Sequence, residues 1–337
     1  MSTDETTNTA RHRAVMADEV TALPADRRPE PGPIAVLPEP EQQFVEAVEA
    51  AGGTVEPLSE RTRGVVWLSN KDAAAFPAVL EAHPGIGWVQ LPFAGVDAFA
   101  GILASEDRAG LVWTSAKGAY AQPVAEHALV LTLALLRVLP KRVRARSWAT
   151  EPEGRSLYGL DVVIVGAGGI ALELMRLLEP FGARVTIVRR SETPVPGAVR
   201  TVTASQLGEV LPSADLVVVA AALTEGTRHL FGAPEFAAMK DTAYLVNIAR
   251  GGLVDTDALL DALRSGAIAG AGLDVTDPEP LPDGHPLWDE PNVLITPHQA
   301  DTPEMTAPLL AERIRLNVRA FLDDGRFVGV VDPSAGY

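Results

Sequence analysis

The chain has 337 residues, enough for about two domains that each bury a core of their own. Its net charge of -16 argues against nucleic acid or an anionic membrane surface as a partner, because both are bound through basic patches. The sequence contains no cysteine, which excludes disulfides, thiolate catalysis and cysteine-based metal sites, and we expect no metal.

Residues 1–32 at the N-terminus are polar, charged and proline-containing, so we expect a flexible extension. They lack the apolar core of a signal peptide. The most apolar helical stretch of the chain, Ala128–Leu139, is too short to span a bilayer. These features favour a cytoplasmic protein with no membrane segment.

Short apolar strands and helices alternate from residue 33 onward, which predicts a first α/β domain. In the sequence LPFAGVD a glycine follows one of these strands and opens a helix. Backbone N–H groups at such a turn could hold a carboxylate, although an ordinary strand–helix turn accounts for the pattern as well. The expected strands are 34–37, 55–58, 64–68, 87–91 and 111–114, and the expected helices are 41–51 and 71–82.

A long helical stretch over 122–146 comes next. Pro123 fits the first turn of this helix, whereas Pro140 should kink it or end it early. The stretch is a candidate bridge between domains and a candidate dimer surface, but its apolar stripe fits a plain core helix as well. The stripe consists of Val124, Ala128, Leu131, Leu135 and Val138.

The sequence DVVIVGAGGIA then joins an apolar strand to a helix through the pattern G-x-G-x-x-A, formed by Gly166, Gly168 and Ala171. Gly166 permits a tight turn, Gly168 lets a pyrophosphate approach the backbone, and Ala171 allows close helix packing. The first N–H groups of the helix, at Gly169 and Ile170, would face the phosphates. This combination predicts a dinucleotide site.

Further strands and helices alternate up to His298, which predicts a doubly wound, mostly parallel sheet. A helix near 303–323 has no place in that sheet and should return to the first domain. We therefore expect two doubly wound α/β domains: a Rossmann nucleotide-binding domain over 122–298, inserted into a discontinuous flavodoxin-like substrate domain over 33–121 and 299–337. The strands expected in the nucleotide domain are Val162–Val165, Val185–Val188, Leu216–Val219, Tyr244–Asn247, Gly272–Val275 and Val293–Ile295.

Three ionisable residues fall at or beyond the carboxyl ends of successive strands in this domain: Arg250, Glu279 and His298. Arginine can bind a carboxylate through two hydrogen bonds, and histidine can donate a proton to a carbonyl oxygen. A carboxylate nearby orients an imidazole and favours its charged form. Each residue alone could be an ordinary loop residue, but together they suit reduction of a 2-keto acid. The other histidines lack such company, and only His285 is near Glu279 in sequence.

The stretches LVNIARGGLVD, AGAGLDVTDPEP and NVLITPH resemble the D-isomer-specific 2-hydroxyacid dehydrogenase family, and the resemblance extends from about residue 34 onward. It implies that Arg250 binds substrate, that Glu279 supports the histidine, and that His298 is the acid–base group. It also implies that the backbone at Ala94 and Gly95 holds the substrate carboxylate. A homodimer is a further implication.

The resemblance assigns three more residues to the cofactor. Asp274 and the carbonyl of Ala249 would hold the nicotinamide amide, and Thr227 would lie near the cofactor. The chain departs from the family pattern in two places: Gln299-Ala300-Asp301 replaces a stretch with a glycine, and Ala222 stands where a proline is usual. These departures alter the rim of the pocket and remove no catalytic group.

The choice between NAD and NADP depends on the end of the second strand, where an NAD enzyme needs an acid. Here Arg189 and Arg190 occupy that position. Guanidinium groups suit a 2′-phosphate and cannot accept a hydrogen bond from a hydroxyl, so NADP is favoured over NAD, although the pair could be solvated surface residues.

The sequence therefore predicts an oxidoreductase that transfers a hydride between NAD(P)H and a small 2-keto acid, with glyoxylate or hydroxypyruvate favoured. A short phosphoglycerate dehydrogenase is one alternative, with Lys117 as a possible phosphate ligand. The other alternative is a non-catalytic binding protein that senses the nucleotide.

Overall fold

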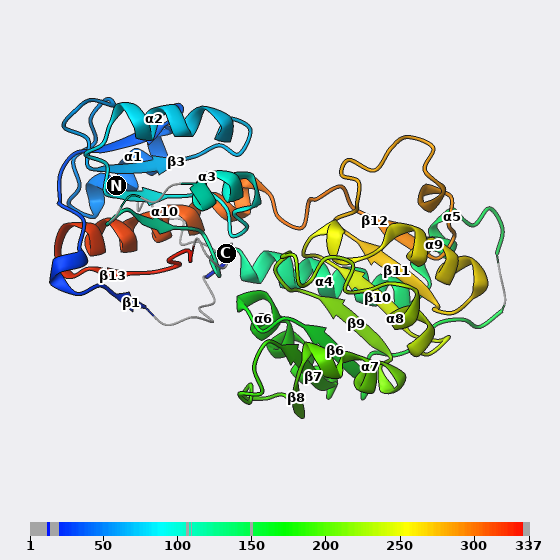
Figure 1. Cartoon of the computed structure of the whole chain (residues 1–337). Helices are drawn as coiled ribbons and strands as arrows, with labels where there is room; N and C mark the ends of the chain where they lie inside the picture. Colours follow the sequence, from blue (N-terminus) through cyan, green and yellow to red (C-terminus); the bar gives the residue numbers. More distant parts are fainter. Residues whose placement is uncertain (1–11, 14–19, 106–107, 109, 149–150, 333–337) are drawn as a thin grey trace, which may run out of the picture. The chain divides into compact units, whose positions relative to one another are not determined.

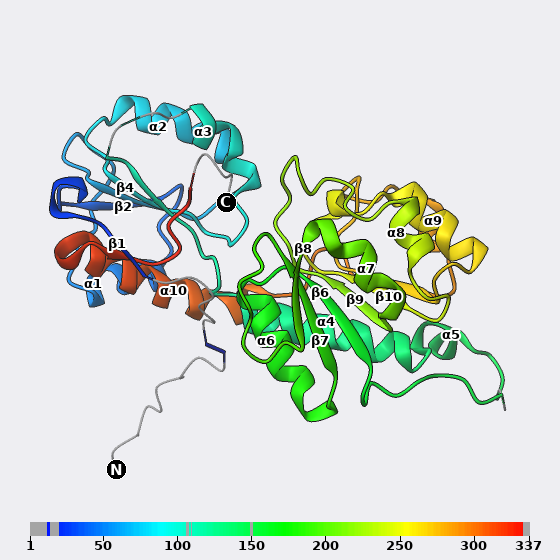
Figure 2. The same ribbon diagram turned by 60° about the horizontal axis from the view of Figure 1, so that its bottom comes forward.

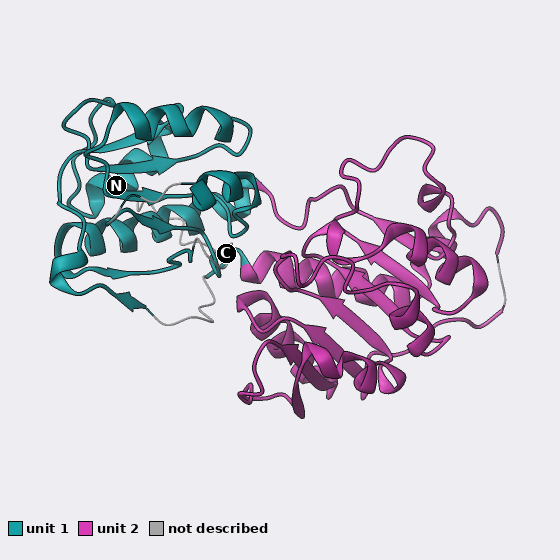
Figure 3. Cartoon of the chain, in the orientation of Figure 1, with its two compact units in different colours: residues 1–120, 303–337 teal, residues 121–302 magenta. Residues whose placement is uncertain are grey.

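The computed structural model describes residues 12–13, 20–105, 108, 110–148 and 151–332 (Figure 1). The chain divides into two compact units, which are coloured separately in Figure 3. Unit 1 comprises residues 1–120 and 303–337, and unit 2 comprises residues 121–302. The boundaries predicted from the sequence lie after residues 121 and 298.

Unit 1 contains a four-stranded parallel sheet with the strand order β2-β3-β4-β5. The strand expected over 55–58 is wrong: Val55 makes only a single parallel bridge to Ile34. The β-strands are β2 (Ile34–Leu37), β3 (Gly64–Trp67), β4 (Trp88–Gln90) and β5 (Val112–Thr114), and the helices are α1 (Gln42–Ala50), α2 (Phe76–Ala82), α3 (Ala100–Ser105) and α10 (Pro303–Arg319). Helix α10 comes from the C-terminal segment and packs against α1.

The expectation of a flexible extension does not hold for its last residues. Strand β1 (Thr21–Ala22) pairs antiparallel with β13 (Arg326–Phe327) near the C-terminus. The N–H of Leu23 also donates to the carbonyl of Gly325, at 2.9 Å. Backbone pairing with a distant strand fixes this segment, and composition alone does not reveal such a partner. Residues 1–11 and 14–19 lie outside the described residues.

The described residues of unit 2 form a seven-stranded sheet in the order β8-β7-β6-β9-β10-β11-β12, with all neighbours parallel. The chain starts in the middle at β6, winds to one edge and then returns to continue from β9 to the other edge, so the switch point lies between β6 and β9. The strands are β6 (Asp161–Val165), β7 (Arg184–Arg189), β8 (Arg200–Thr203), β9 (Leu216–Val219), β10 (Tyr244–Asn247), β11 (Gly270–Leu273) and β12 (Val293–Ile295). The expected α/β class with two parallel sheets is confirmed.

Two strands of unit 2 differ from the expectation. Strand β8 was not expected, because it is an edge strand in which only Val202 is fully buried. Strand β11 begins at Gly270, two residues before the expected start. Its glycines give no apolar signal, yet they are required by close neighbours: a Cβ on Gly272 would lie 3.1 Å from the Leu131 side chain, and one on Gly270 would lie 2.5 Å from the Asn292 carbonyl oxygen.

The helices of unit 2 cover both faces of its sheet, with α7, α8 and α9 on one face and α4 and α6 on the other (Figure 2). The stretch expected as one helix over 122–146 is broken at Val138, which has a left-handed backbone (φ 55°). Helix α5 then starts with Pro140 in its first turn. The helices are α4 (Ala121–Leu136), α5 (Leu139–Arg144), α6 (Gly169–Leu178), α7 (Leu207–Val210), α8 (Ala233–Ala238) and α9 (Thr256–Ser265).

The apolar stripe of α4 belongs to the core of unit 2. Ala128, Leu131 and Leu135 are buried, and the helix packs on α6 and on strands β10 to β12. This packing fixes α4 against the half of the sheet in which the candidate residues follow the strands.

Candidate functional site

The glycine turn after β6 has the geometry of a phosphate-binding loop. Gly166 has φ 118°, and a Cβ at this position would lie only 2.4 Å from the carbonyl oxygen of Ala220. A Cβ on Gly168, in contrast, would meet nothing within 4 Å, so the space above this residue is open. Gly168 is the N-cap of α6 and has no side chain to cap the helix. The N–H groups of Gly169 and Ile170 therefore begin a helix that is open to an anion.

Two further candidate cofactor residues follow β7 and β9, the strands on either side of β6. Strand β7 ends at Arg189, which is half-buried, and the exposed Arg190 follows it directly. After β9, Thr227 closes a loop: its Oγ1 donates to the carbonyl of Ala222 and accepts from the N–H of Thr224, both at 2.8 Å. Thr227 thus holds the backbone of the loop that follows the switch-point strand.

Arg250 follows β10 in a segment tied down by Asn247, the last residue of the strand. Asn247 Nδ2 donates to the Arg250 carbonyl at 2.9 Å, and Asn247 Oδ1 accepts from the Ala249 N–H at 3.1 Å. The half-buried Arg250 side chain donates from Nη1 to the Ala249 carbonyl at 2.6 Å. Behind it, a Cβ on Gly251 would lie 1.8 Å from the Thr276 carbonyl oxygen, so only glycine fits there.

His298 and Glu279 lie together in unit 2. The distance from His298 Nδ1 to Glu279 Oε1 is 2.6 Å, and the two side chains are 51% and 41% exposed. A carboxylate only accepts hydrogen bonds, so Nδ1 carries the proton in this pair and Nε2 is the remaining ring nitrogen. His298 has a left-handed backbone (φ 51°), which is unusual for a residue with a side chain. His285, in contrast, caps a short helical turn, where its Nδ1 accepts from the Leu287 N–H.

Asp274, at the end of β11, holds the segment that carries His298. Its carbonyl oxygen accepts from the His298 N–H at 2.7 Å, and its carboxylate accepts from the N–H groups of Gln299 and Ala300 at 2.9 and 3.1 Å. Burial raises the pKa of the Asp274 carboxyl. The nearby His127 ring and the hydrogen bonds that the carboxylate accepts, including one from Thr296, outweigh this effect, so the pKa is lowered overall. Asp274 is therefore a buried carboxylate.

His127 was not predicted as a site residue, because it does not follow a predicted strand, unlike the three candidate catalytic residues. Its Nε2 lies 2.8 Å from Thr296 Oγ1 and 3.5 Å from Asp274 Oδ1. Because the Thr296 hydroxyl donates to Asp274 Oδ1 at 2.6 Å, His127 must donate to Thr296 from Nε2. The position of His127 depends on the packing of α4 against β12, and no local pattern in the sequence signals it.

Asp301 stands three residues beyond His298 and is half-buried. Burial raises the pKa of its carboxyl above the ordinary value of 3.8, and the Asp274 carboxylate adds to the rise, while His298 opposes it. The stretch that departs from the family pattern thus brings a further carboxyl group next to the His298 segment.

In unit 1, Ala94 and Gly95 lie half-buried in the loop after β4. Neither N–H group donates to an acceptor in the part of the protein that the structure describes. The two residues before them are held in place: the Phe93 carbonyl accepts from the Ala116 N–H at 3.0 Å, and the Pro92 carbonyl accepts from the Tyr120 hydroxyl at 2.6 Å. The loop therefore presents the N–H groups of Ala94 and Gly95 as donors, and the residues before them are held by hydrogen bonds.

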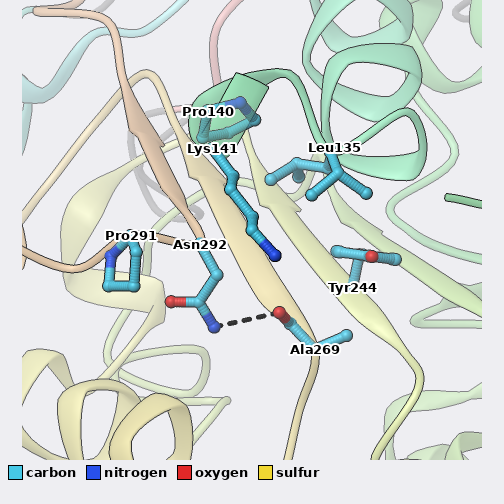
Figure 4. A pocket seen from close by; sticks show the side chains of 8 residues that line it. Leu135, Pro140, Lys141, Tyr244, Ala269, Pro291 and Asn292 are labelled. Atoms are coloured by element: carbon cyan, nitrogen blue, oxygen red, sulfur yellow. Dashed lines mark hydrogen bonds between the residues drawn. The ribbon is translucent and has the colours of Figure 1, made fainter. Parts of the chain in front are cut away.

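A small pocket of unit 2 lies apart from these residues, at the amino ends of strands β10 to β12 (Figure 4). Its lining is mostly apolar, and Asn292 Nδ2 donates across it to the Ala269 carbonyl at 2.9 Å. Ligands of doubly wound sheets bind at the opposite, carboxyl ends of the strands. Among the described residues, no group of acidic or histidine side chains is arranged to hold a metal ion, and no helix has the length and apolarity to cross a membrane.

Three comparisons with known proteins bear on this arrangement. The family model "D-isomer specific 2-hydroxyacid dehydrogenase, NAD binding domain" matches residues 129–300, about half of the chain. The chain is 40% identical over 275 residues to an uncharacterised protein of Corynebacterium melassecola, covering 80% of this chain and 88% of that protein. It is 34% identical over 260 residues to a glyoxylate reductase of Thermofilum pendens, covering 72% of this chain and 74% of that enzyme.

A solved structure agrees with these sequence matches. The D-isomer specific 2-hydroxyacid dehydrogenase of Xanthobacter autotrophicus, determined in complex with NADPH and MES, has a TM-score of 0.77 and 29% sequence identity. The match covers 91% of this chain and 100% of that one, so it includes both units.

Proposed function

The chain belongs to the family of D-isomer specific 2-hydroxyacid dehydrogenases, oxidoreductases that use a pyridine nucleotide, and we propose that it reduces small 2-keto acids such as glyoxylate or hydroxypyruvate with NADPH. The observation that carries the proposal is the pair His298–Glu279, with 2.6 Å between Nδ1 and Oε1, at the carboxyl ends of strands β11 and β12. We further propose that the protein is a cytoplasmic homodimer.

The residues at the glycine turn fit a dinucleotide. The open space above Gly168 accommodates a pyrophosphate, and the N–H groups of Gly169 and Ile170 suit its negative charge. Arg189 and Arg190 would bind the 2′-phosphate of NADPH, since guanidinium groups match phosphate oxygens in pairs. The Xanthobacter relative was solved with NADPH, which is in line with this choice.

Asp274, Ala249 and Thr227 would hold the nicotinamide end, as the family resemblance implies. Asp274 and the Ala249 carbonyl already take part in hydrogen bonds of the protein, to Gln299 and Ala300 and to Arg250. Asp274 Oδ1 already accepts from Thr296 and Gln299. A nicotinamide amide would therefore share Asp274 Oδ2, which accepts from the Ala300 N–H, and the Ala249 carbonyl, because an oxygen with two lone pairs can accept a second hydrogen bond.

When bound, NADPH supplies a hydride to the carbonyl carbon of the substrate. His298 donates the matching proton to the carbonyl oxygen from Nε2, because Nδ1 is held by Glu279. One 2-keto acid, one NADPH and one proton give one 2-hydroxy acid and one NADP⁺. Glu279 stabilises the imidazolium before the transfer and keeps the ring oriented. In the reverse direction His298 removes the proton of the hydroxyl.

Substrate binding needs groups that recognise a carboxylate. Arg250 would supply a guanidinium that binds the carboxylate and polarises the neighbouring carbonyl. Ala94 and Gly95 would add two backbone N–H groups, which bind an anion without a charged side chain. Each of these contacts would favour negatively charged 2-keto acids over neutral carbonyl compounds.

The alternatives are not favoured. A phosphoglycerate dehydrogenase would need further basic groups for its phosphate, and the relative described above is a glyoxylate reductase. A nucleotide sensor would not need the close pairing of His298 with Glu279.

A steady-state assay tests the proposal. Glyoxylate, hydroxypyruvate, pyruvate and 3-phosphohydroxypyruvate are each offered with NADPH and with NADH, and the loss of absorbance of the reduced nucleotide is followed. We expect the highest kcat/KM with glyoxylate or hydroxypyruvate and NADPH. Binding of NADPH without turnover of any of these substrates would instead favour the sensor.

A further inference from the structure

Helix α10 of unit 1 carries two buried polar side chains one turn apart, Arg313 and Asn317, which are 2% and 0% exposed. A helix that only filled the core would carry apolar residues at these positions, because burying a guanidinium or an amide costs free energy unless its hydrogen bonds are satisfied. Asn317 reaches the end of β4, which leads into the loop with Ala94 and Gly95, and Arg313 reaches the segment that follows β5.

Arg313 holds the segment that leaves β5. Its Nη1 donates to the Ser115 carbonyl and its Nη2 to the Lys117 carbonyl, both at 2.7 Å. Burial lowers the pKa of Arg313 to about 10, so it stays protonated at neutral pH. Gly329 packs over this contact: a Cβ there would lie 2.3 Å from Nη1, and the Ser115 N–H donates to the Gly329 carbonyl at 2.8 Å. The guanidinium is thus enclosed by backbone.

Asn317 holds the end of β4 through Gln90. Asn317 Nδ2 donates to Gln90 Oε1 at 2.7 Å, and Gln90 Nε2 donates to the Leu91 carbonyl at 2.8 Å. Asn317 also exchanges two hydrogen bonds with the backbone of Val328, at 2.8 and 2.9 Å. The carbonyl of Leu91, directly before Pro92, is therefore held by the buried side chains of Gln90 and Asn317.

The two strand ends are then joined to each other. The Tyr120 hydroxyl donates to the Pro92 carbonyl at 2.6 Å, and the Ala116 N–H donates to the Phe93 carbonyl at 3.0 Å. Tyr120 is itself 6% exposed. Arg313 thus fixes the segment of Ser115 to Lys117, and this segment together with Tyr120 fixes Pro92 and Phe93, the two residues before Ala94.

We propose that Arg313 and Tyr120 are positioning residues that hold the N–H groups of Ala94 and Gly95 in the geometry that binds the substrate carboxylate. The inference rests on the proposed function. Backbone N–H groups bind an anion well only when they point toward it. A displacement of about 1 Å in a binding group can lower the rate roughly a hundredfold. The structure anchors the two residues directly before Ala94, and neither Arg313 nor Tyr120 needs to touch the substrate.

The test uses Tyr120→Phe, which removes one hydroxyl, and Arg313→Lys, which keeps the charge but loses the two-pronged contact. Both are compared with matched exchanges elsewhere: Tyr158→Phe at an exposed tyrosine and Arg315→Lys on the outer side of the same helix. We expect each test variant to raise KM for glyoxylate and the inhibition constant of oxamate, a carboxylate that is not reduced, by about tenfold. Turnover at saturation and the Kd of NADPH should stay within about threefold of those of the unaltered protein.

The measured KM and oxamate inhibition decide whether Tyr120 and Arg313 are positioning residues. Unchanged KM and oxamate inhibition in a folded Tyr120→Phe protein would overturn the proposal, as would a fall in kcat without a change in KM. If Arg313→Lys lowers Tm so far that it cannot be assayed, Tyr120→Phe alone decides, because it removes no packing. A lack of reduction of any keto acid by the unaltered protein would overturn the proposed function and this inference with it. An active protein with unaffected variants would overturn the inference alone.

Discussion

Replacing Glu279 by glutamine separates the charge of this residue from its shape. Glutamine can still accept from His298 Nδ1, so the ring stays oriented, but the anion that stabilises the imidazolium is gone. A hydrogen bond to a charged group contributes about 1.5 to 3 kcal/mol. The His298 and Glu279 side chains are 51% and 41% exposed, so water screens the pair and the lower part of that range applies. Since 1.36 kcal/mol equals about a tenfold change in rate, we expect kcat to fall roughly tenfold to thirtyfold.

The assay measures kcat for glyoxylate reduction together with the Kd of NADPH from the change in nucleotide fluorescence. The Kd should stay within about twofold, because Glu279 is proposed to act only through the histidine. Glu209→Gln serves as the matched control, since it breaks a similarly exposed ion pair with Arg200. A Glu279→Gln variant with unchanged kcat would refute the view that the Glu279 charge supports proton transfer. An equal loss of kcat in Glu209→Gln would show that the loss comes from the change in net charge of the protein and not from the pairing with His298.

Three further changes probe the rest of the site. Arg189→Asp should shift the ratio of kcat/KM for NADPH over NADH by at least about tenfold toward NADH, and an unchanged ratio would speak against the 2′-phosphate contact. Gly168→Ala should leave Tm unchanged, because its Cβ meets nothing within 4 Å, yet weaken NADPH binding measured by calorimetry. Asp274→Asn should lower the free energy of unfolding in urea at pH 7 by about 1 to 3 kcal/mol. Because the folded pKa of Asp274 is lowered, its contribution is present above 3.8 and lost as pH falls below that value, so the gap between the two proteins should close in acid.

The parts of the site that the sequence predicts are those fixed by local geometry. Gly166 needs φ 118° and a position against Ala220, and only glycine meets both demands, so the residue type itself reports the turn. His298 and Glu279 were expected together because each follows a strand, and parallel neighbours bring such positions to one edge. In the structure their side chains are 2.6 Å apart.

What the sequence does not reveal depends on contacts between distant segments. His127 reaches Asp274 and Thr296 only because α4 packs against the far half of the sheet. Strand β8 reads as a polar stretch because an edge strand buries only one of its residues. Arg313 is one of several charged residues of helix α10, and nothing in the sequence distinguishes it from the others, although it is buried. In each case the residue type is compatible with an exposed position, and tertiary packing decides otherwise.

The departure from the family pattern after His298 can be understood from the same hydrogen bonds. Asp274 receives three consecutive backbone N–H groups, those of His298, Gln299 and Ala300. These contacts depend on the backbone, so the segment keeps its path whatever side chains stand at 299 and 300. His298, with its left-handed conformation at φ 51°, is the first of the three residues held in this way. The side chain that the departure adds next to the anchor is Asp301, whose pKa burial raises. A sequence change at this position can therefore alter the charge beside His298 while its orientation toward Glu279 is preserved.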